Sequence, residues 1–94
     1  MKDVLLLDLV DTVVTAIKPL EKGHVFISEK DGAPVTCLDP IPQGHKIAIQ
    51  DISEGEILYK YGKNIGISTR KIRRGELVHT HNLVSLRGKE RRSR

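Results

Sequence analysis

The sequence predicts a small all-β protein. Short apolar runs, many of them rich in β-branched residues, alternate along the chain with breaks made of Gly, Pro and Asp. β-Branched side chains favour strands, and regularly spaced turn signals between such runs are typical of strands joined by tight turns. No run keeps a helical period for three turns. Together these observations favour a compact all-β domain with many turns.

Six strands of about five residues each are expected from these runs. They cover residues 13–17, 25–27, 34–38, 46–49, 57–61 and 77–84, and turn signals lie between them at 21–23, 30–32, 39–44, 53–55 and 73–75. Two segments are ambiguous. Residues 3–10 fit a strand or one helical turn, and residues 66–72 fit a short helix or a 3₁₀ turn.

Three of the turns share a weak sequence repeat. The stretches "PLEKGHV" (19–25), "DISEGEI" (51–57) and "KIRRGEL" (71–77) share an apolar residue, two mostly charged residues, Gly, a polar residue and an apolar residue. We expect each shared glycine to adopt a positive φ in a tight turn, where a Cβ atom is disfavoured. The uneven spacing of the copies excludes a solenoid.

The length of 94 residues predicts one domain, which we place at residues 1–86 with a basic tail at 87–94. A domain of this size builds a modest core and cannot enclose a large catalytic cavity. If the chain takes part in catalysis, it is expected to share walls with another chain.

The net charge of +4 comes from the tail alone. The last eight residues, "RGKERRSR", hold five basic residues and one acid, whereas the other 86 carry 11 of each sign. A basic end on a neutral body is typical of a solvated tail. Nucleic-acid binding through this tail is disfavoured, because the chain has only three aromatic residues and no stacking platform.

A single cysteine, Cys37, excludes an internal disulfide and a cysteine-rich zinc site, and it fits a reducing cytoplasm. The apolar start of the chain is interrupted by acids and is followed by no small-residue cleavage site, so we expect no signal peptide. No segment is long and apolar enough to predict a membrane span. These features predict a cytoplasmic protein.

Two histidines stand one residue apart in "GELVHTHNL" (75–83). On a strand, His79 and His81 would project from one face, where they could ligate a metal, hold a carboxylate or transfer a proton. A bare H-x-H pair is more often a pair of solvated histidines on an edge strand. Asn82 adds a neutral donor and acceptor at the same end.

Two other stretches place cations near turns. In "IPQGHKIAIQD", His45 and Lys46 stand at a strand entrance, where one of them can face a cleft; a solvated turn is the plainer interpretation. In "YKYGKNIG" (59–66), Tyr59 and Tyr61 are expected to share one strand face and Lys60 to take the other. Lys60 is either a surface lysine or an ammonium group aimed at an anionic substrate.

Four stretches in this order, "DTVVTAI", "IPQGHKIAIQDISEGE", "YKYGKNIG" and "GELVHTHNL", resemble the small N-terminal domain of the altronate and galactarate dehydratase family. They are similar also to the small subunit of sulfolactate sulfo-lyase. The resemblance covers residues 11–83. It implies a SAF domain with a β-clip fold, a fold shared with type III antifreeze proteins and with a domain beside sialic acid synthase barrels, which lack this histidine and lysine set.

The resemblance also implies a function. In the family, the module joins a larger catalytic part, and together they eliminate water or sulfite from a hydroxy acid. A divalent metal, in an iron-type site, is expected to be held mainly by the large partner. The shared site would be lined by His45, Lys60 and His79 as catalytic residues and by Lys46, His81 and Asn82 as substrate-binding residues. The resemblance assigns no metal ligand to this chain.

One position departs from the family pattern: Thr12 stands where relatives typically have Asn after an Asp. We interpret the change as affecting a turn outside the cluster. The basic tail has two open interpretations, a docking element for an acidic partner surface or a solvated end. The alternative function is a stand-alone β-clip module that binds a carbohydrate or a protein partner without catalysis.

Overall fold

The computed structural model describes residues 2–85, which form nine short strands and no helix. The strands are β1 (Val4–Leu5), β2 (Val13–Ala16), β3 (Val25–Ile27), β4 (Pro34–Thr36), β5 (Lys46–Ala48), β6 (Ile57–Lys60), β7 (Lys63–Ser68), β8 (Leu77–Val78) and β9 (Leu83–Val84). The all-β prediction is confirmed over this range. None of these residues forms a helix that could cross a membrane.

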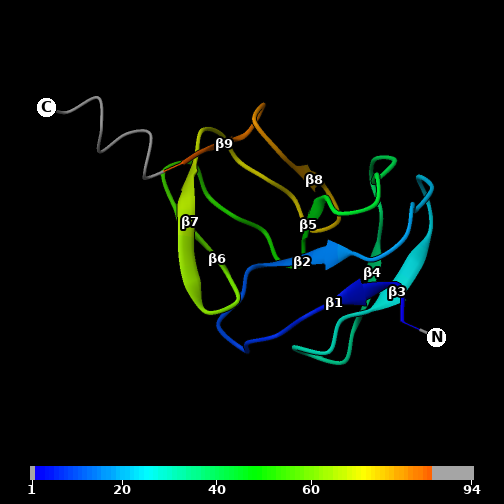
Figure 1. Cartoon of the computed structure of the whole chain (residues 1–94). Helices are drawn as coiled ribbons and strands as arrows, with labels where there is room; N and C mark the ends of the chain where they lie inside the picture. The colour runs from blue at the N-terminus through cyan, green and yellow to red at the C-terminus, as the bar shows by residue number, and fades with distance from the viewer. Residues whose placement is uncertain (1, 86–94) are drawn as a thin grey trace, which may run out of the picture.

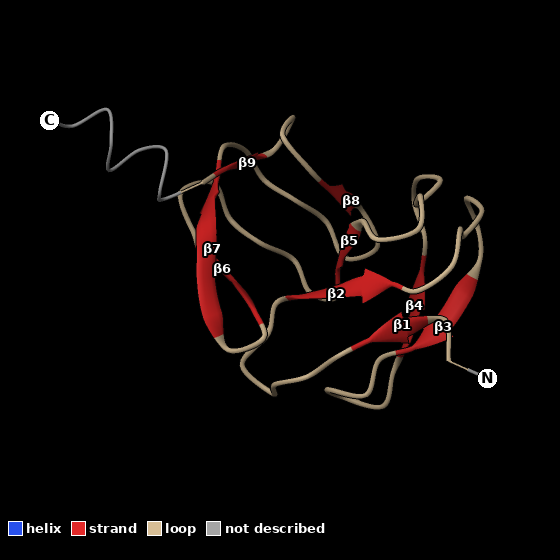
Figure 2. Ribbon diagram, in the orientation of Figure 1, coloured by secondary structure: helices blue, strands red, loops and turns tan. Residues whose placement is uncertain are grey.

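The strands pair into three small antiparallel sheets (Figure 1). A four-stranded sheet has the order β1-β2-β5-β8, a two-stranded sheet consists of β3 and β4, and a three-stranded sheet has the order β6-β7-β9. Figure 2 shows β6 and β7 on one side of β2 and β5, with β3 and β4 on the other. Long loops between the strands carry much of the chain.

The four-stranded sheet separates two apolar clusters. Successive side chains of a strand point to opposite faces, so β2 and β5 supply both clusters. Val14 and Ile47, which are register partners, pack with Phe26 of the two-stranded sheet. Val13 and Ala48, the next pair in register, pack with residues of the three-stranded sheet. The face that carries Val13 and Ala48 also carries Thr15 and Lys46, which are two residues away along β2 and β5.

Four related turns shape the loops, one more than the sequence analysis predicted. Gly23, Gly44, Gly55 and Gly75 all adopt a positive φ, between 84° and 96°. In each turn the residue after the glycine donates its N–H to the carbonyl three residues earlier. The fourth copy, "PIPQGHK" (40–46), was missed because Pro42 and Gln43 replace the charged pair and Lys46 replaces the last apolar residue.

The apolar residues that open the four turns meet in pairs. Leu20 bridges Ile41, and Ile52 bridges Ile72, through reciprocal backbone hydrogen bonds of 2.8–2.9 Å. All four side chains are buried. The sequence repeat therefore corresponds to a repeat of local structure, because the apolar residue that opens each turn is buried against the same residue of another turn.

Two element predictions were wrong. Residues 77–84 are not one strand: β8 ends at residue 78, a turn covers 79–82, and β9 begins at residue 83. Residues 66–72 are not helical, because β7 (Lys63–Ser68) is the longest strand and occupies the first part of that segment. Within residues 3–10 only β1 forms. The predicted tail at 87–94 and its boundary at residue 86 lie outside the described residues.

Candidate functional site

The turn after β8 is closed by Asn82. Its Oδ1 accepts a hydrogen bond from the N–H of His79 at 2.9 Å, and its Nδ2 donates to the carbonyl of Leu77 at 2.9 Å. Its own N–H donates to the carbonyl of His79 at 3.0 Å. The side chain is fully buried. Asn82 therefore builds the turn, and its predicted contact with substrate stays a prediction.

The turn changes the relation between the two histidines of the H-x-H motif. His79 follows the last residue of β8, and His81 lies exposed in the turn itself. They do not share a strand face, so the expectation of two parallel imidazoles from i and i+2 was wrong. The partner of His79 comes instead from another strand.

His45 and His79 lie next to each other. Their ring centroids are 4.9 Å apart with an interplanar angle of 50°. The register explains the pairing, because β5 and β8 are antiparallel with Lys46 opposite Val78, which brings the preceding and following residues together. Nδ1 of His45 is 3.4 Å from the carbonyl oxygen of Gln43. Both rings reach the surface, so the pair can exchange protons with a ligand.

Lys46 is partly buried one residue further along β5. Burial lowers the pKa of its ammonium group, and the nearby charge of Lys60 lowers it further. Among residues 2–85, no carboxylate forms an ion pair with either lysine. Two cations thus share one region without an internal counter-ion, and this arrangement suits an anionic ligand.

Lys60 reaches this region from the end of β6. Its Nζ lies 4.8 Å from the centre of the Tyr61 ring. Tyr61 belongs to the turn between β6 and β7 and has a φ of 57°. The prediction that Tyr59 and Tyr61 share a strand face was therefore wrong, since β6 ends at Lys60. The turn folds the Tyr61 ring against the lysine.

Thr15 adds a polar atom that sequence reasoning missed. It is the register partner of Lys46 on β2, and its Oγ1 is buried with no hydrogen-bond partner among the described residues. Buried hydroxyl groups are normally hydrogen-bonded. The Thr15 hydroxyl is therefore available to a ligand as a hydrogen-bond donor or acceptor next to Lys46. A threonine within the apolar run of β2 gave no sequence signal.

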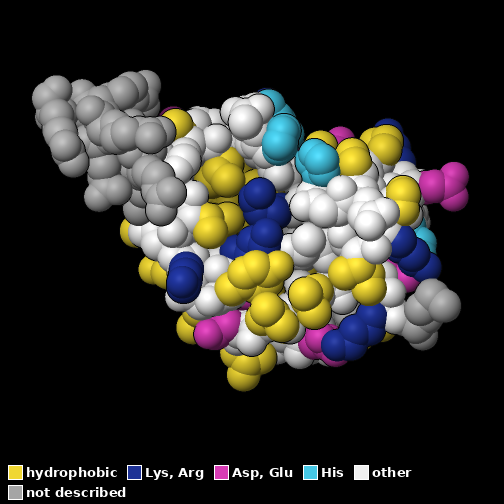
Figure 3. All heavy atoms as spheres, in the orientation of Figure 1, with side chains coloured by type: hydrophobic (Ala, Val, Ile, Leu, Met, Phe, Trp, Pro, Cys, Tyr) yellow, Lys and Arg dark blue, Asp and Glu magenta, His cyan; other side chains and the backbone are white. Residues whose placement is uncertain are grey.

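The space-filling view shows these residue types gathered on one face. Lys and Arg side chains lie in a depression in the middle of Figure 3, with apolar side chains around it and histidines at its upper rim. The predicted site residues therefore come from β5, from the end of β6 and from the turn after β8. His24 is separate, because its Nε2 lies 2.6 Å from Asp3 Oδ2.

Comparison with known proteins gives the family. A family model described as the altronate/galactarate dehydratase SAF domain matches residues 2–86. The chain belongs to this family. The resemblance of the sequence motifs is thereby confirmed, and the SAF domain covers all the residues that the structure describes.

The SAF domain has relatives of two kinds. It is 37% identical over 75 residues to altronate dehydratase of Bacillus subtilis (strain 168), a match that covers 77% of this chain and 14% of that protein. It is 49% identical over 49 residues to (2R)-sulfolactate sulfo-lyase subunit alpha of Chromohalobacter salexigens, which covers 52% of each. A second subunit alpha, from Paracoccus pantotrophus, is 33% identical over 63 residues, which is 67% of this chain and 94% of that one.

Thr12 contacts the strand that carries Lys60. Its Oγ1 accepts the N–H of Tyr59 at 3.1 Å, and its own N–H donates to the carbonyl of Tyr59 at 3.0 Å. Tyr59 immediately precedes Lys60. Thr12 therefore supports the backbone next to the lysine, and the interpretation that it lies outside the cluster of six predicted site residues stays a prediction.

The residues of this SAF domain do not fit a complete metal site. Catalytic metal sites commonly take three protein ligands, and structural zinc sites take four. Within residues 2–85, no three His, Cys, Asp or Glu side chains gather to hold an ion. The His45–His79 pair offers two nitrogen ligands at most. We therefore derive no chemical step through a metal from this chain.

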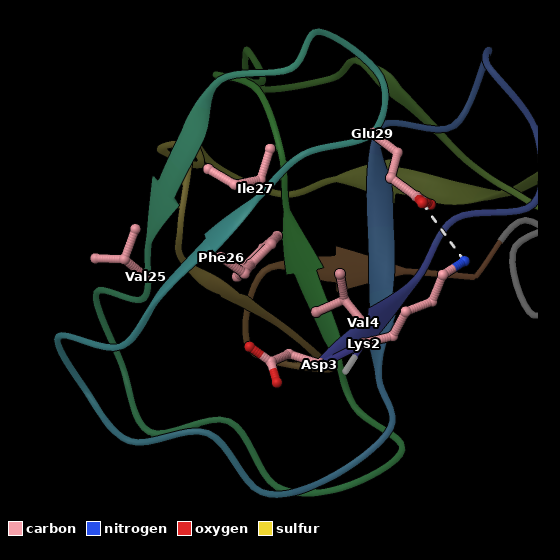
Figure 4. A pocket seen from close by; sticks show the side chains of 7 residues that line it. All are labelled: Lys2, Asp3, Val4, Val25, Phe26, Ile27 and Glu29. Carbon is pink, nitrogen blue, oxygen red and sulfur yellow. Dashed lines mark ion pairs between the residues drawn. The ribbon is translucent and has the colours of Figure 1, made fainter.

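A hollow among the described residues of the SAF domain lies elsewhere (Figure 4). It has a volume of about 500 Å³ and is lined by Lys2, Asp3, Val4, Val25, Phe26, Ile27 and Glu29. An ion pair of 3.4 Å joins Lys2 and Glu29 at this hollow. Lys18 and then His24 hold the pKa of Asp3 below its usual range, so its carboxylate is already engaged. None of the six predicted site residues lines this hollow.

Proposed function

We propose that this chain is the small subunit of a two-chain hydroxy-acid dehydratase of the altronate/galactarate dehydratase type. It contributes His and Lys residues to a β-elimination site shared with a large catalytic subunit, and it is inactive alone. One observation carries the proposal: Lys46 directly follows His45 of the imidazole pair and feels the charge of Lys60, and no carboxylate among residues 2–85 forms an ion pair with either lysine. The names of the subunit alpha relatives support a separate small chain.

The proposed chemistry follows from the charges of these groups. β-Elimination removes the proton α to a carboxylate and expels a leaving group from the β carbon. Lys46 and Lys60 bind the carboxylate and stabilise the negative charge that develops on it as the proton leaves. An ammonium group with a lowered pKa also donates a stronger hydrogen bond to an anion.

The imidazole pair supplies the proton transfer. An imidazole nitrogen can accept or donate a proton, so His45 or His79 can take the α proton or protonate the leaving group. Which of the two acts as the base is left open. His81, exposed in the same turn, and Asn82, which shapes the turn, complete the predicted substrate-binding set.

The large subunit carries the remaining parts of the proposal. The divalent metal that the resemblance implies, in an iron-type site, is assigned mainly to that subunit, since this chain offers only two adjacent imidazoles. The substrate is a sugar acid or another hydroxy acid, and the leaving group is water or sulfite. The curated names of the relatives include both a dehydratase and a sulfo-lyase.

The alternative is a stand-alone β-clip module that binds a carbohydrate or a protein. The hollow beside β1 and β3 favours this alternative, because the histidine pair does not line it and it is bordered by exposed Val25 and Ile27. A module of this kind would bind its ligand without a second chain and would catalyse nothing.

Reconstitution separates the two functions. The full chain is tagged and recovered from its native cells, and co-purifying chains are identified by mass spectrometry together with their metal content. The small chain, the large chain and their mixture are then assayed with a panel of sugar acids and with sulfolactate. We expect activity only in the mixture. Recovery of the chain alone, metal-free, with direct binding of a sugar acid, would establish the binding module instead.

A further inference from the structure

The turn that carries Lys60 into the site has an unfavourable sequence. Tyr61 and Gly62 form a two-residue hairpin loop, and both have a positive φ, of 57° and 73°. Such loops favour Asn, Asp or Gly at the first position, because a larger side chain is strained there. Tyr61 is the only non-glycine residue with a positive φ among residues 2–85. An external contact is therefore expected to hold the turn.

Asp11 provides that contact from the loop before β2. Its Oδ2 accepts the N–H of Tyr61 at 2.9 Å, and its Oδ1 accepts the N–H of Gly62 at 2.8 Å. The residue is only 1% exposed. A buried carboxylate is costly unless it is well hydrogen-bonded, and hydrogen bonds to a charged acceptor are the stronger kind. Both oxygens are used on this turn.

Thr12 contacts the hairpin at Tyr59, the residue that precedes Lys60. It exchanges two hydrogen bonds with the backbone of Tyr59, one through its N–H and one through its hydroxyl. Asp11 and Thr12 thus fix the residues immediately before and after Lys60. Asp8, from the same loop, lies so close to Gly62 that a Cβ atom there would be 2.5 Å from its carboxylate.

We propose that Asp11, assisted by Thr12, is a positioning residue that fixes the hairpin backbone on both sides of Lys60 and thereby directs its ammonium group. This inference rests on the proposed function for its catalytic meaning, while the positioning itself concerns the chain alone. The sequence motif "DT" at 11–12 thereby acquires a role in the site, through the backbone of the hairpin and without contact with substrate.

The test uses Asp11→Asn in the full chain. Asn has the same shape, but its Nδ2 cannot accept a hydrogen bond, so one of the two turn N–H groups loses its acceptor. Amide hydrogen exchange at Tyr61 and Gly62 is expected to accelerate about tenfold to a hundredfold. The matched control is Asp51→Asn, because Asp51 also accepts a backbone N–H, but that of Arg74, which is not part of the hairpin that carries Lys60.

A second readout separates positioning from simple support of the fold. The pKa of Lys46 is measured by NMR titration of its side chain. If Lys60 moves away, this pKa rises toward its ordinary value, whereas loss of a carboxylate charge alone would lower it. Lys60→Met defines the full size of the rise. Thr12→Val repeats the test without any change in charge, and it serves also if Asp11→Asn does not fold.

Three outcomes decide the matter. Faster exchange with a raised Lys46 pKa in Asp11→Asn or Thr12→Val, and neither change in Asp51→Asn, supports the proposal. Faster exchange with an unaltered Lys46 pKa in both variants overturns it in favour of a purely structural role. Unaltered amide exchange in both variants overturns the proposal outright.

In the reconstituted enzyme, we expect Asp11→Asn to lower kcat by a larger factor than it raises KM. A pKa change without any dehydratase activity would leave the positioning intact and refute the proposed function.

Discussion

The imidazole ring of His45 lies 4.9 Å from that of His79, although 34 residues separate them in the chain. The contact arises where β5 begins and β8 ends, since those strands are antiparallel neighbours. Asn82 fixes the backbone of His79 through the N–H group. The pair is therefore supported by the sheet on one side and by a closed turn on the other, and such support is what a site residue requires.

Replacement of either histidine tests the pair. In the reconstituted two-chain enzyme, His45→Ala or His79→Ala is expected to lower kcat by about 10²–10⁴-fold if that residue transfers a proton. The control is His24→Ala, because His24 follows a glycine in an equivalent turn but pairs with Asp3 instead. We expect His24→Ala to change thermal stability and to leave kcat unchanged. Full activity in both site variants would remove the histidines from the mechanism.

Lys46→Met is expected to stabilise the isolated chain at neutral pH. Burial and then Lys60 lower the pKa of Lys46, so the folded state disfavours the charged form that the unfolded state tolerates. This penalty is complete below the folded pKa and disappears as the pH rises to the ordinary value near 10.5. Methionine keeps the apolar stem without the charge.

The measurement is the urea midpoint of wild type and Lys46→Met at neutral pH and at rising alkaline pH. Lys63→Met, at the exposed start of β7, corrects for the general effect of removing one positive charge. The advantage of Lys46→Met over this control should shrink as the pH rises. An advantage that is absent at neutral pH, or that grows with pH, contradicts the expected sign.

Much of the architecture could be predicted from the sequence, because turn glycines and β-branched runs report local conformation directly. The positive φ of Gly23, Gly55 and Gly75 follows from local residue preference. The strand at residues 63–68, in contrast, was not predicted, and the reason is physical. "KNIGIS" contains Gly66, whose φ of 154° lies in a region that only glycine enters easily, and glycine normally argues against a strand.

The site was only partly predictable. His45, Lys46, Lys60 and His79 could be named, but their mutual arrangement depends on the antiparallel pairing of strands far apart in sequence, which local patterns do not encode. The turn at 79–82 was missed because apolar residues flank it and its closing bonds come from one asparagine. Asp11 begins the "DTVVTAI" stretch of the resemblance, but its contact with the hairpin could not be predicted, since its partners are backbone N–H groups that carry no sequence mark.

Asn82→Ala tests the turn that presents His79. The variant leaves the N–H of His79 and the carbonyl of Leu77 without their partners in a partly buried place, at a cost of about 1–3 kcal/mol. For a domain of this size that corresponds to a fall in Tm of about 4–20 °C. Thermal unfolding followed by circular dichroism measures it. Asn64→Ala is the control, because Asn64 is exposed and accepts only the N–H of Gly66, two residues on.

We expect Asn64→Ala to lower Tm by only a few degrees, since water can replace an exposed partner. In the reconstituted enzyme, Asn82→Ala should also lower kcat, because the loosened turn no longer fixes the backbone of His79. If the two asparagine variants had equal Tm values, the buried bonds of Asn82 would not stabilise the fold as argued.

Two glycines in equivalent turns allow a final comparison, between Gly55→Ala and Gly75→Ala. Both residues have a positive φ, 84° and 96°, so alanine is strained at either place by about 1–2 kcal/mol. A Cβ atom at Gly55 meets nothing within 4 Å, whereas one at Gly75 collides with the backbone carbonyl of Thr36.

The backbone at Thr36 cannot move aside as a side chain can, and the N–H of Leu38 donates to the carbonyl of Gly75 at 2.8 Å. Gly75→Ala must therefore displace the chain after β4 or the start of β8, and its loss of Tm in thermal unfolding should be at least twice that of Gly55→Ala. Equal losses would mean that conformational strain alone decides both positions and that the close approach to Thr36 relaxes without cost.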